Sequence, residues 1–65
     1  MMYMVSQEFH AKYSSLLEKI VKITFKDGSK RVGLFNDEFY EDSSILVSCE
    51  TIKIENIEKM ELVED

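Results

Sequence analysis

The sequence predicts a mainly β fold. One N-terminal helix at about residues 6–19 is followed by five short, strongly bent antiparallel strands, which form a small barrel over about residues 20–63. Three observations carry this prediction. Where the helix ends, the spacing of apolar residues changes from three and four to strict alternation. An Asp-Gly pair, with a second glycine five residues later, marks a hairpin. No proline, linker or repeat divides the 65 residues, which we therefore expect to form a single domain, residues 1–65.

The N-terminal segment has the spacing of an amphipathic helix. Its apolar residues form one stripe: Phe9, Tyr13, Leu16, Leu17 and Ile20. Ser6 is the expected N-cap, and Glu8 follows in the first turn, where the helix dipole favours an acid. Val5 is then placed to form half of a hydrophobic staple. We expect the stripe to dock the helix on the sheet.

The alternating segment after the helix predicts a half-buried strand. Its two faces are Val21, Ile23 and Phe25 on one side and Lys22, Thr24 and Lys26 on the other. Asp27-Gly28 supplies the positive φ angles of a tight hairpin turn. The second strand then runs through Val32 and Leu34 towards Phe39.

Three further short strands complete the predicted sheet. One spans residues 45–47 after a polar connection. A single 3-10 turn at residues 55–59 separates the last two strands. The residues expected to face inward in those two strands are Ile52 and Ile54, then Met60 and Leu62. Closing five bent strands into a barrel is the economical way to hide the edges of such a sheet.

Gly33 lies inside the second strand, where glycine normally destabilises a sheet. Glycine is useful where a strand bends sharply to serve both halves of a barrel; the alternative is an incidental glycine with no bend. The same position affects Phe35. In a regular strand Phe35 faces away from Val32 and Leu34, whereas a bulge near Gly33 would put Phe35 inside.

With these elements, the sequence resembles the Sm-like group of SH3-type barrels. The matching residues are Val21-x-Ile23-x-Phe25-Lys26-Asp27-Gly28 and then Gly33-x-Phe35, which are similar to the first Sm motif. The leading helix and the 3-10 turn also fit that family's order. The resemblance implies the barrel but not the family's uridine pocket. Ser43 stands where the motif has an asparagine, and the second motif, an arginine-glycine pair, is missing.

Composition narrows the class of function. Cys49 and His10 are the only residues of their kinds, so neither an intrachain disulfide nor a tetrahedral zinc site is expected, and we expect no cofactor. A nucleophilic Cys49–His10 pair is conceivable, but a cysteine in a strand or tight turn is mostly inert packing, and we predict no enzyme. No apolar run approaches the ~20 residues of a membrane span, and residues 1–9 lack the basic region and the long apolar region that are typical of a signal peptide. We expect a cytoplasmic protein with no membrane partner.

Binding is the remaining class, and two hypotheses differ in their partner. The first is a protein-interaction module that binds a protein or itself as a homo-oligomer, and such a module fits an accessory protein of a phage or mobile element. Its contacts are sheet edges or the aromatic-acidic segment, residues 34–42. The candidates are Phe35, Phe39, Tyr40, Asp37 and Glu38. The alternative for the aromatics is a place in the core.

The second hypothesis is a degenerate Sm-like nucleic-acid-binding protein. Its candidates are Lys22, Lys26, Lys30 and Arg31, which surround the hairpin turn. These residues are either a basic lobe or an ordinary solvated turn. The net charge of −5 disfavours a phosphate backbone as the partner, so nucleic acid is the less favoured hypothesis.

Overall fold

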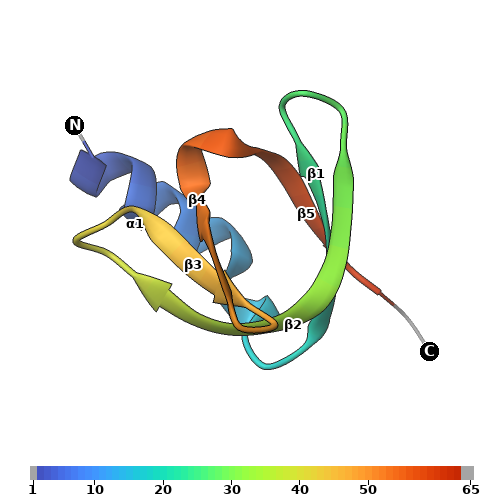
Figure 1. Cartoon of the computed structure of the whole chain (residues 1–65). Coiled ribbons are helices and arrows are strands. Elements are labelled where there is room, and N and C mark those ends of the chain that lie inside the picture. The colour runs from blue at the N-terminus through green and yellow to red at the C-terminus, as the bar shows by residue number, and fades with distance from the viewer. Residues whose placement is uncertain (1, 64–65) are drawn as a thin grey trace.

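Within residues 2–63, the backbone forms one α-helix, two 3-10 turns and five strands (Figure 1). The computed structural model describes residues 2–63, with the side chains of residues 7–63. In chain order the elements are α1 (Met2–Tyr13), η1 (Ser14–Leu16), β1 (Ile20–Phe25), β2 (Lys30–Phe39), β3 (Ser44–Val47), β4 (Glu50–Lys53), η2 (Ile54–Asn56) and β5 (Ile57–Leu62). The strands pair antiparallel in one sheet of order β4-β3-β2-β1-β5. The predicted mainly β class is confirmed.

The helix begins and ends earlier than predicted. Ser6 and Val5 lie inside α1, so the predicted N-cap at Ser6 and the staple at Val5 are wrong. The helix gives way to η1 at a pair of serines, whose hydroxyls compete with helical backbone bonds. Glu18 then turns the chain with a left-handed φ of 67°. Ile20 begins β1, where it is 43% exposed, and does not extend the helical stripe.

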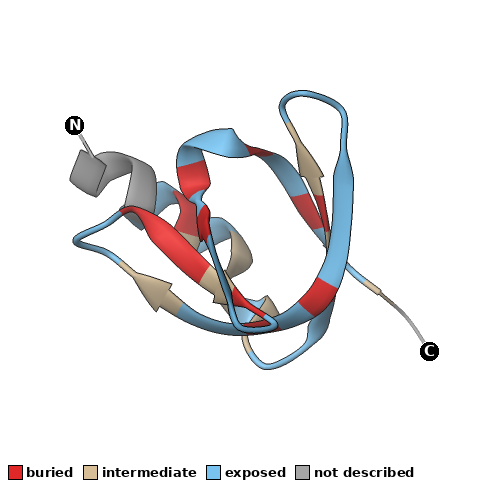
Figure 2. Ribbon diagram, viewed as in Figure 1, coloured by how far each residue is buried: buried red, intermediate tan, exposed pale blue. Residues whose placement is uncertain are grey.

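The rest of the stripe docks α1 as predicted. Phe9 is buried, with its ring centroid 4.7 Å from that of Tyr13 and 6.4 Å from that of Phe35. Leu16 and Leu17 pack partly against the same core. The buried apolar residues are Phe9, Val21, Ile23, Phe35, Ile45, Val47, Ile52, Ile54, Ile57 and Met60. Figure 2 shows buried segments on several strands, and most of β3 is buried.

The two faces of β2 are the reverse of the expected ones. Val32 is 58% exposed and Leu34 is 36% exposed, whereas Gly33 and Phe35 are buried. The register explains this arrangement, because Gly33 lies opposite the buried Val21 and Leu34 lies opposite the exposed Ile20. Phe35 therefore faces inward in a regular strand. The irregularity in β2 lies later, between Phe35 and Asp37, and not near Gly33.

Gly33 lies where β2 changes partners. β2 pairs with β1 as far as Leu34 and with β3 from Phe35 onward, which is the place of the predicted bend. In Figure 1, β2 curves round the molecule between these two pairings. A Cβ at position 33 would lie 2.6 Å from Ser48 Oγ and 2.8 Å from Val47 Cγ1. Close approach of the β3–β4 turn is thus a reason for glycine that we did not predict from the sequence.

The other turns and the last strands follow the predictions with small differences. Gly28 has a φ of 93°, as the hairpin turn requires. The 3-10 turn η2 comes slightly earlier than expected and carries the buried Ile54. In β5, Met60 is buried, but Leu62 is exposed at the edge of the sheet. Among the described strands, β4 pairs only with β3 and β5 only with β1, so β4 and β5 are the two edges.

We expect Gly33→Ala to lower the free energy of unfolding by about 1–3 kcal/mol, because the methyl group has no space beside Ser48 and Val47. Ser48→Gly removes the nearest atoms and tolerates the φ of 46° at that position. The cost of Gly33→Ala should therefore shrink in a Ser48→Gly background, as measured by denaturant unfolding of all four chains. An equal cost in both backgrounds would show that close approach is not the reason for this glycine.

Candidate protein-interaction surfaces

Three aliphatic side chains gather on the outward face of β1 and β2. Ile20 and Leu34 lie directly opposite each other across the two strands, and Val32 lies two residues from Leu34 on the same face. The exposed fraction is 43% for Ile20, 58% for Val32 and 36% for Leu34. We call Ile20, Val32 and Leu34 the outer patch. Contiguous exposed apolar groups of this kind often mark interaction sites.

Lysines border the outer patch. Lys22 lies opposite Val32 on one side and opposite Glu61 on the other, with its Nζ 4.0 Å from Glu61 Oε1. Lys59 Nζ lies 3.6 Å from the other oxygen of the same carboxylate, Glu61 Oε2. Thr24 of β1 lies between two of these lysines, with Lys30 of β2 on one side and Lys59 of β5 on the other. This face therefore combines the aliphatic residues with three lysines and one carboxylate.

The four predicted nucleic-acid residues do not form one patch. Lys22 and Lys30 are on the outward face, but Arg31 lies opposite the buried Ile23, on the other face of the hairpin. Arg31 also forms an ion pair with Glu50. Lys26 lies in the hairpin turn. The strand alternation separates these bases, because Lys30 and Arg31 are consecutive residues and point to opposite faces.

The bulge in β2 distributes the aromatic-acidic segment between core and surface. Phe35 is fully buried, so it belongs to the core and cannot contact a partner. One residue is inserted at Asn36, after which Glu38 lies opposite the buried Ile45. Glu38 is therefore turned inward as well. Asp37 is exposed.

The end of β2 and the turn after it are more accessible. Phe39 is half-buried, and Tyr40 is 45% exposed. Glu41 and Asp42 follow in the exposed turn to β3. Of the predicted candidates, Tyr40 and Asp37 are thus exposed and Phe39 is half-buried.

Glu38 joins the sheet to the helix through His10. His10 Nδ1 lies 2.6 Å from Glu38 Oε1, and the Glu38 side chain is only 10% exposed. Glu38 Oε2 is buried without a hydrogen-bond partner in the described structure. Tyr40 packs edge-on to His10, with 5.6 Å between the ring centroids. Partial burial, and then the charge of Glu38, raise the pKa of the Tyr40 phenol.

His10→Ala should lower the free energy of unfolding by about 1–3 kcal/mol at neutral pH, because it leaves the buried Glu38 carboxylate without its partner. Glu38→Gln in the same chain should recover part of that loss, since a neutral amide is easier to bury. The measurement is denaturant unfolding of the wild type, both single variants and the double variant. Additive effects of the two changes would contradict the coupling.

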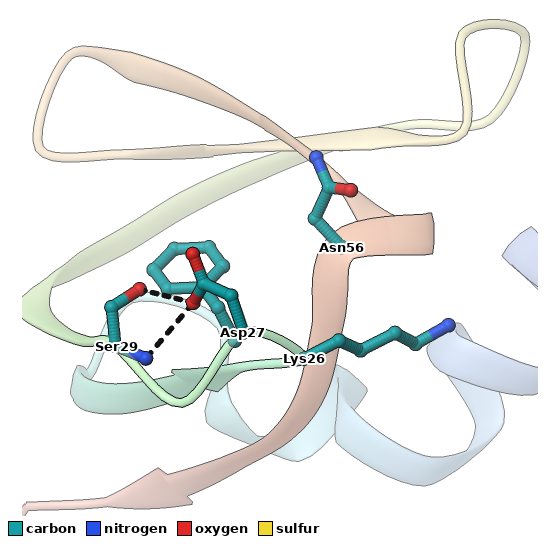
Figure 3. A pocket seen from close by; sticks show the side chains of 5 residues that line it. Lys26, Asp27, Ser29 and Asn56 are labelled. Atoms are coloured by element: carbon teal, nitrogen blue, oxygen red, sulfur yellow. Dashed lines mark hydrogen bonds between the residues drawn. The ribbon is translucent and has the colours of Figure 1, made fainter.

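An open hollow lies beside the hairpin turn (Figure 3). Its volume is about 450 Å³, and it is lined by Phe25, Lys26, Asp27, Ser29 and Asn56. Asp27 Oδ1 accepts hydrogen bonds from the Ser29 hydroxyl at 2.7 Å and from the Ser29 backbone N–H at 2.9 Å. In Figure 3, Asp27 and Ser29 face each other while Lys26 extends away from them. The carboxylate thus serves to fix the turn.

The hydrogen bonds from Ser29, the hydroxyl first and then the backbone N–H, hold the pKa of Asp27 below its usual value. Ser29→Ala should therefore raise the Asp27 pKa, which can be followed by NMR titration of the carboxyl carbon. Because the folded pKa is lowered, the stabilisation from Asp27 is present above the unfolded pKa and is lost as the pH falls through the folded pKa. Ser15→Ala serves as the control at another exposed serine, and an unchanged Asp27 pKa in Ser29→Ala would contradict the assignment.

The remaining chemistry-bearing residues do not converge. Cys49 is exposed in the turn between β3 and β4, with a φ of 72°. The Cys49–His10 pair is not among the contacts of the described residues, where His10 contacts Glu38 and Tyr40. No group of three potential metal ligands occurs within residues 2–63. In the same part of the chain, no helix has the length and apolar character to cross a membrane.

Comparison with known proteins gives no assignment. No protein-family model, no curated protein and no solved structure matches this chain.

The outer patch was not predicted from the sequence. Residues 32–35 are apolar or glycine on both faces, so alternation alone cannot orient them. The useful signal was Gly33 itself, since a residue that must lack a side chain is expected where packing is tight.

Proposed function

We propose that this chain is a small protein-interaction module and that the outer patch is its contact surface. The observation that carries the proposal is the exposure of Ile20, Val32 and Leu34 on one sheet face. In so short a chain, aliphatic side chains are needed for the core, and three of them here stand in solvent instead. A partner that covers them would gain the free energy of apolar burial.

A Sm-like barrel is the fold context of this proposal. The strand order β4-β3-β2-β1-β5, the leading helix and the 3-10 turn before β5 support that resemblance. The edges of β4 and β5 offer additional backbone groups to a partner strand. We further propose a cytoplasmic, non-enzymatic protein that acts by binding, for which an accessory role in a phage or mobile element is a suitable setting.

The charges favour protein over nucleic acid as the partner. The net charge is −5, and two of the four predicted phosphate-binding residues, Lys22 and Arg31, are already paired with glutamates. Neutralising phosphates would require breaking those pairs against a repulsive overall field. An apolar patch on a protein surface needs no such exchange.

A photo-crosslinking amino acid at position 32, introduced in cells that express the chain natively, tests the proposal. We expect discrete protein adducts from position 32, which disappear when Leu34→Glu places a charge in the patch. The same amino acid at position 55, an exposed residue of η2, is the matched control and should give none of these adducts. Adducts that are destroyed by nuclease, or no protein adduct from position 32, would contradict a protein-interaction module.

A further inference from the structure

The outer patch carries information about the charge of its partner. Lys22, Lys30 and Lys59 lie on the same face as the aliphatic residues, and Glu61 is the one carboxylate that the register places among them. Glu61 lies within 4.0 Å of both Lys22 and Lys59. The face is therefore apolar at its centre and positive at its border. A complementary surface should present an apolar side chain with acids beside it.

The same chain has such a surface. Tyr40 is 45% exposed in the turn directly after β2, and the exposed Glu41 and Asp42 follow it there. Asp37 is exposed on the preceding stretch of β2, and Phe39 between them is half-buried. The acidic tip comprises Asp37, Phe39, Tyr40, Glu41 and Asp42; Glu38 is excluded because its side chain faces inward and is only 10% exposed. The acidic tip pairs aromatic groups with three carboxylates, which is the complement that the outer patch requires.

One molecule cannot bring these two surfaces together. β2 connects them, but it passes from β1 to β3 between Leu34 and Phe35 and curves in doing so. In Figure 1 the turn that holds the acidic tip and the strands that hold the outer patch lie on opposite sides of the molecule. Contact between them therefore needs two molecules.

We propose that the outer patch binds the acidic tip of a second copy of this chain. Tyr40 of one copy packs on the aliphatic residues of the other, and Glu41 and Asp42 lie near Lys30 and Lys59. The contact is heterologous, since it joins different surfaces of identical chains, so an open assembly has an unused outer patch at one end and an unused acidic tip at the other. This inference rests on the proposed function, for which it names the partner.

Two charge reversals, each blocking one surface, test the contact. Lys30→Glu/Lys59→Glu blocks the outer patch, and Glu41→Lys/Asp42→Lys blocks the acidic tip. We expect the wild type to self-associate with rising concentration in sedimentation velocity experiments, and each blocked chain to associate more weakly by roughly tenfold or more. An equimolar mixture of the two blocked chains should recover the association, because the unaltered patch of one chain meets the unaltered tip of the other and the two reversed surfaces are again opposite in charge.

Matched controls and salt dependence complete the test. Lys12→Glu on α1 and Glu55→Lys in η2 change the same charges at exposed residues outside both surfaces, and they should associate as the wild type does. Circular dichroism establishes that each variant is folded. If a reversed chain does not fold, the wild type still decides the matter, because its association must weaken as added salt screens the charges.

The outcomes separate this inference from the proposed function. Blocked chains that associate like the wild type, or a mixture that stays monomeric, would overturn the head-to-tail contact. A wild type that is monomeric at all concentrations would also overturn it. In either case, crosslinks from position 32 to a different protein would leave the proposed function standing. Association that survives the acidic-tip reversal but not the outer-patch reversal would indicate patch-to-patch pairing and would contradict the proposal.

Discussion

The fold depends on the approach of the β3–β4 turn to β2 at Gly33. β2 is shared by both halves of the sheet, and the turn closes over it at a distance that excludes a Cβ atom. Ser48 fixes the approach with its hydroxyl, which accepts the Leu34 N–H at 2.9 Å, while the Ser48 N–H reaches the Leu34 carbonyl at 2.9 Å. The same Ser48 N–H also donates to the side-chain oxygen of Asn36, Oδ1, at 3.2 Å. Backbone polar groups that the change of partner would leave open are thereby satisfied.

The approach at Gly33 and the bulge at Asn36 together decide which side chains reach the solvent. Gly33 faces inward, so its neighbours Val32 and Leu34 face outward. The inserted residue at Asn36 shifts the alternation, so that Glu38 turns towards the core and meets His10 of α1. β2 thus contributes Val32 and Leu34 to the outer patch near its start and Asp37 and Phe39 to the acidic tip near its end, and its Glu38 contacts the helix through His10.

Sequence reasoning succeeded where one physical signal dominated. The change of period predicted the helix and β1, Asp27-Gly28 predicted the hairpin, and the stripe identified Phe9 as a core residue. It failed where several signals competed. Residues 32–35 are compatible with either face, and neither the bulge at Asn36 nor the approach of Ser48 has a pattern in the local sequence. Within the aromatic-acidic segment, alternation alone could not separate Phe35, which is core, from Tyr40, which is exposed.

The strand order has a consequence for how the chain folds during synthesis. β1, β2, β3 and β4 form a meander in which each strand pairs with the next, so these contacts are local and can form early. The pairing of Val21 with Leu62 joins β1 to β5, which the ribosome makes last among the strands. Until then one edge of β1 is open, and Ile57 and Met60 are missing from the core. The nascent meander is therefore incomplete, and chaperones or neighbouring chains can compete for its open edge until β5 arrives.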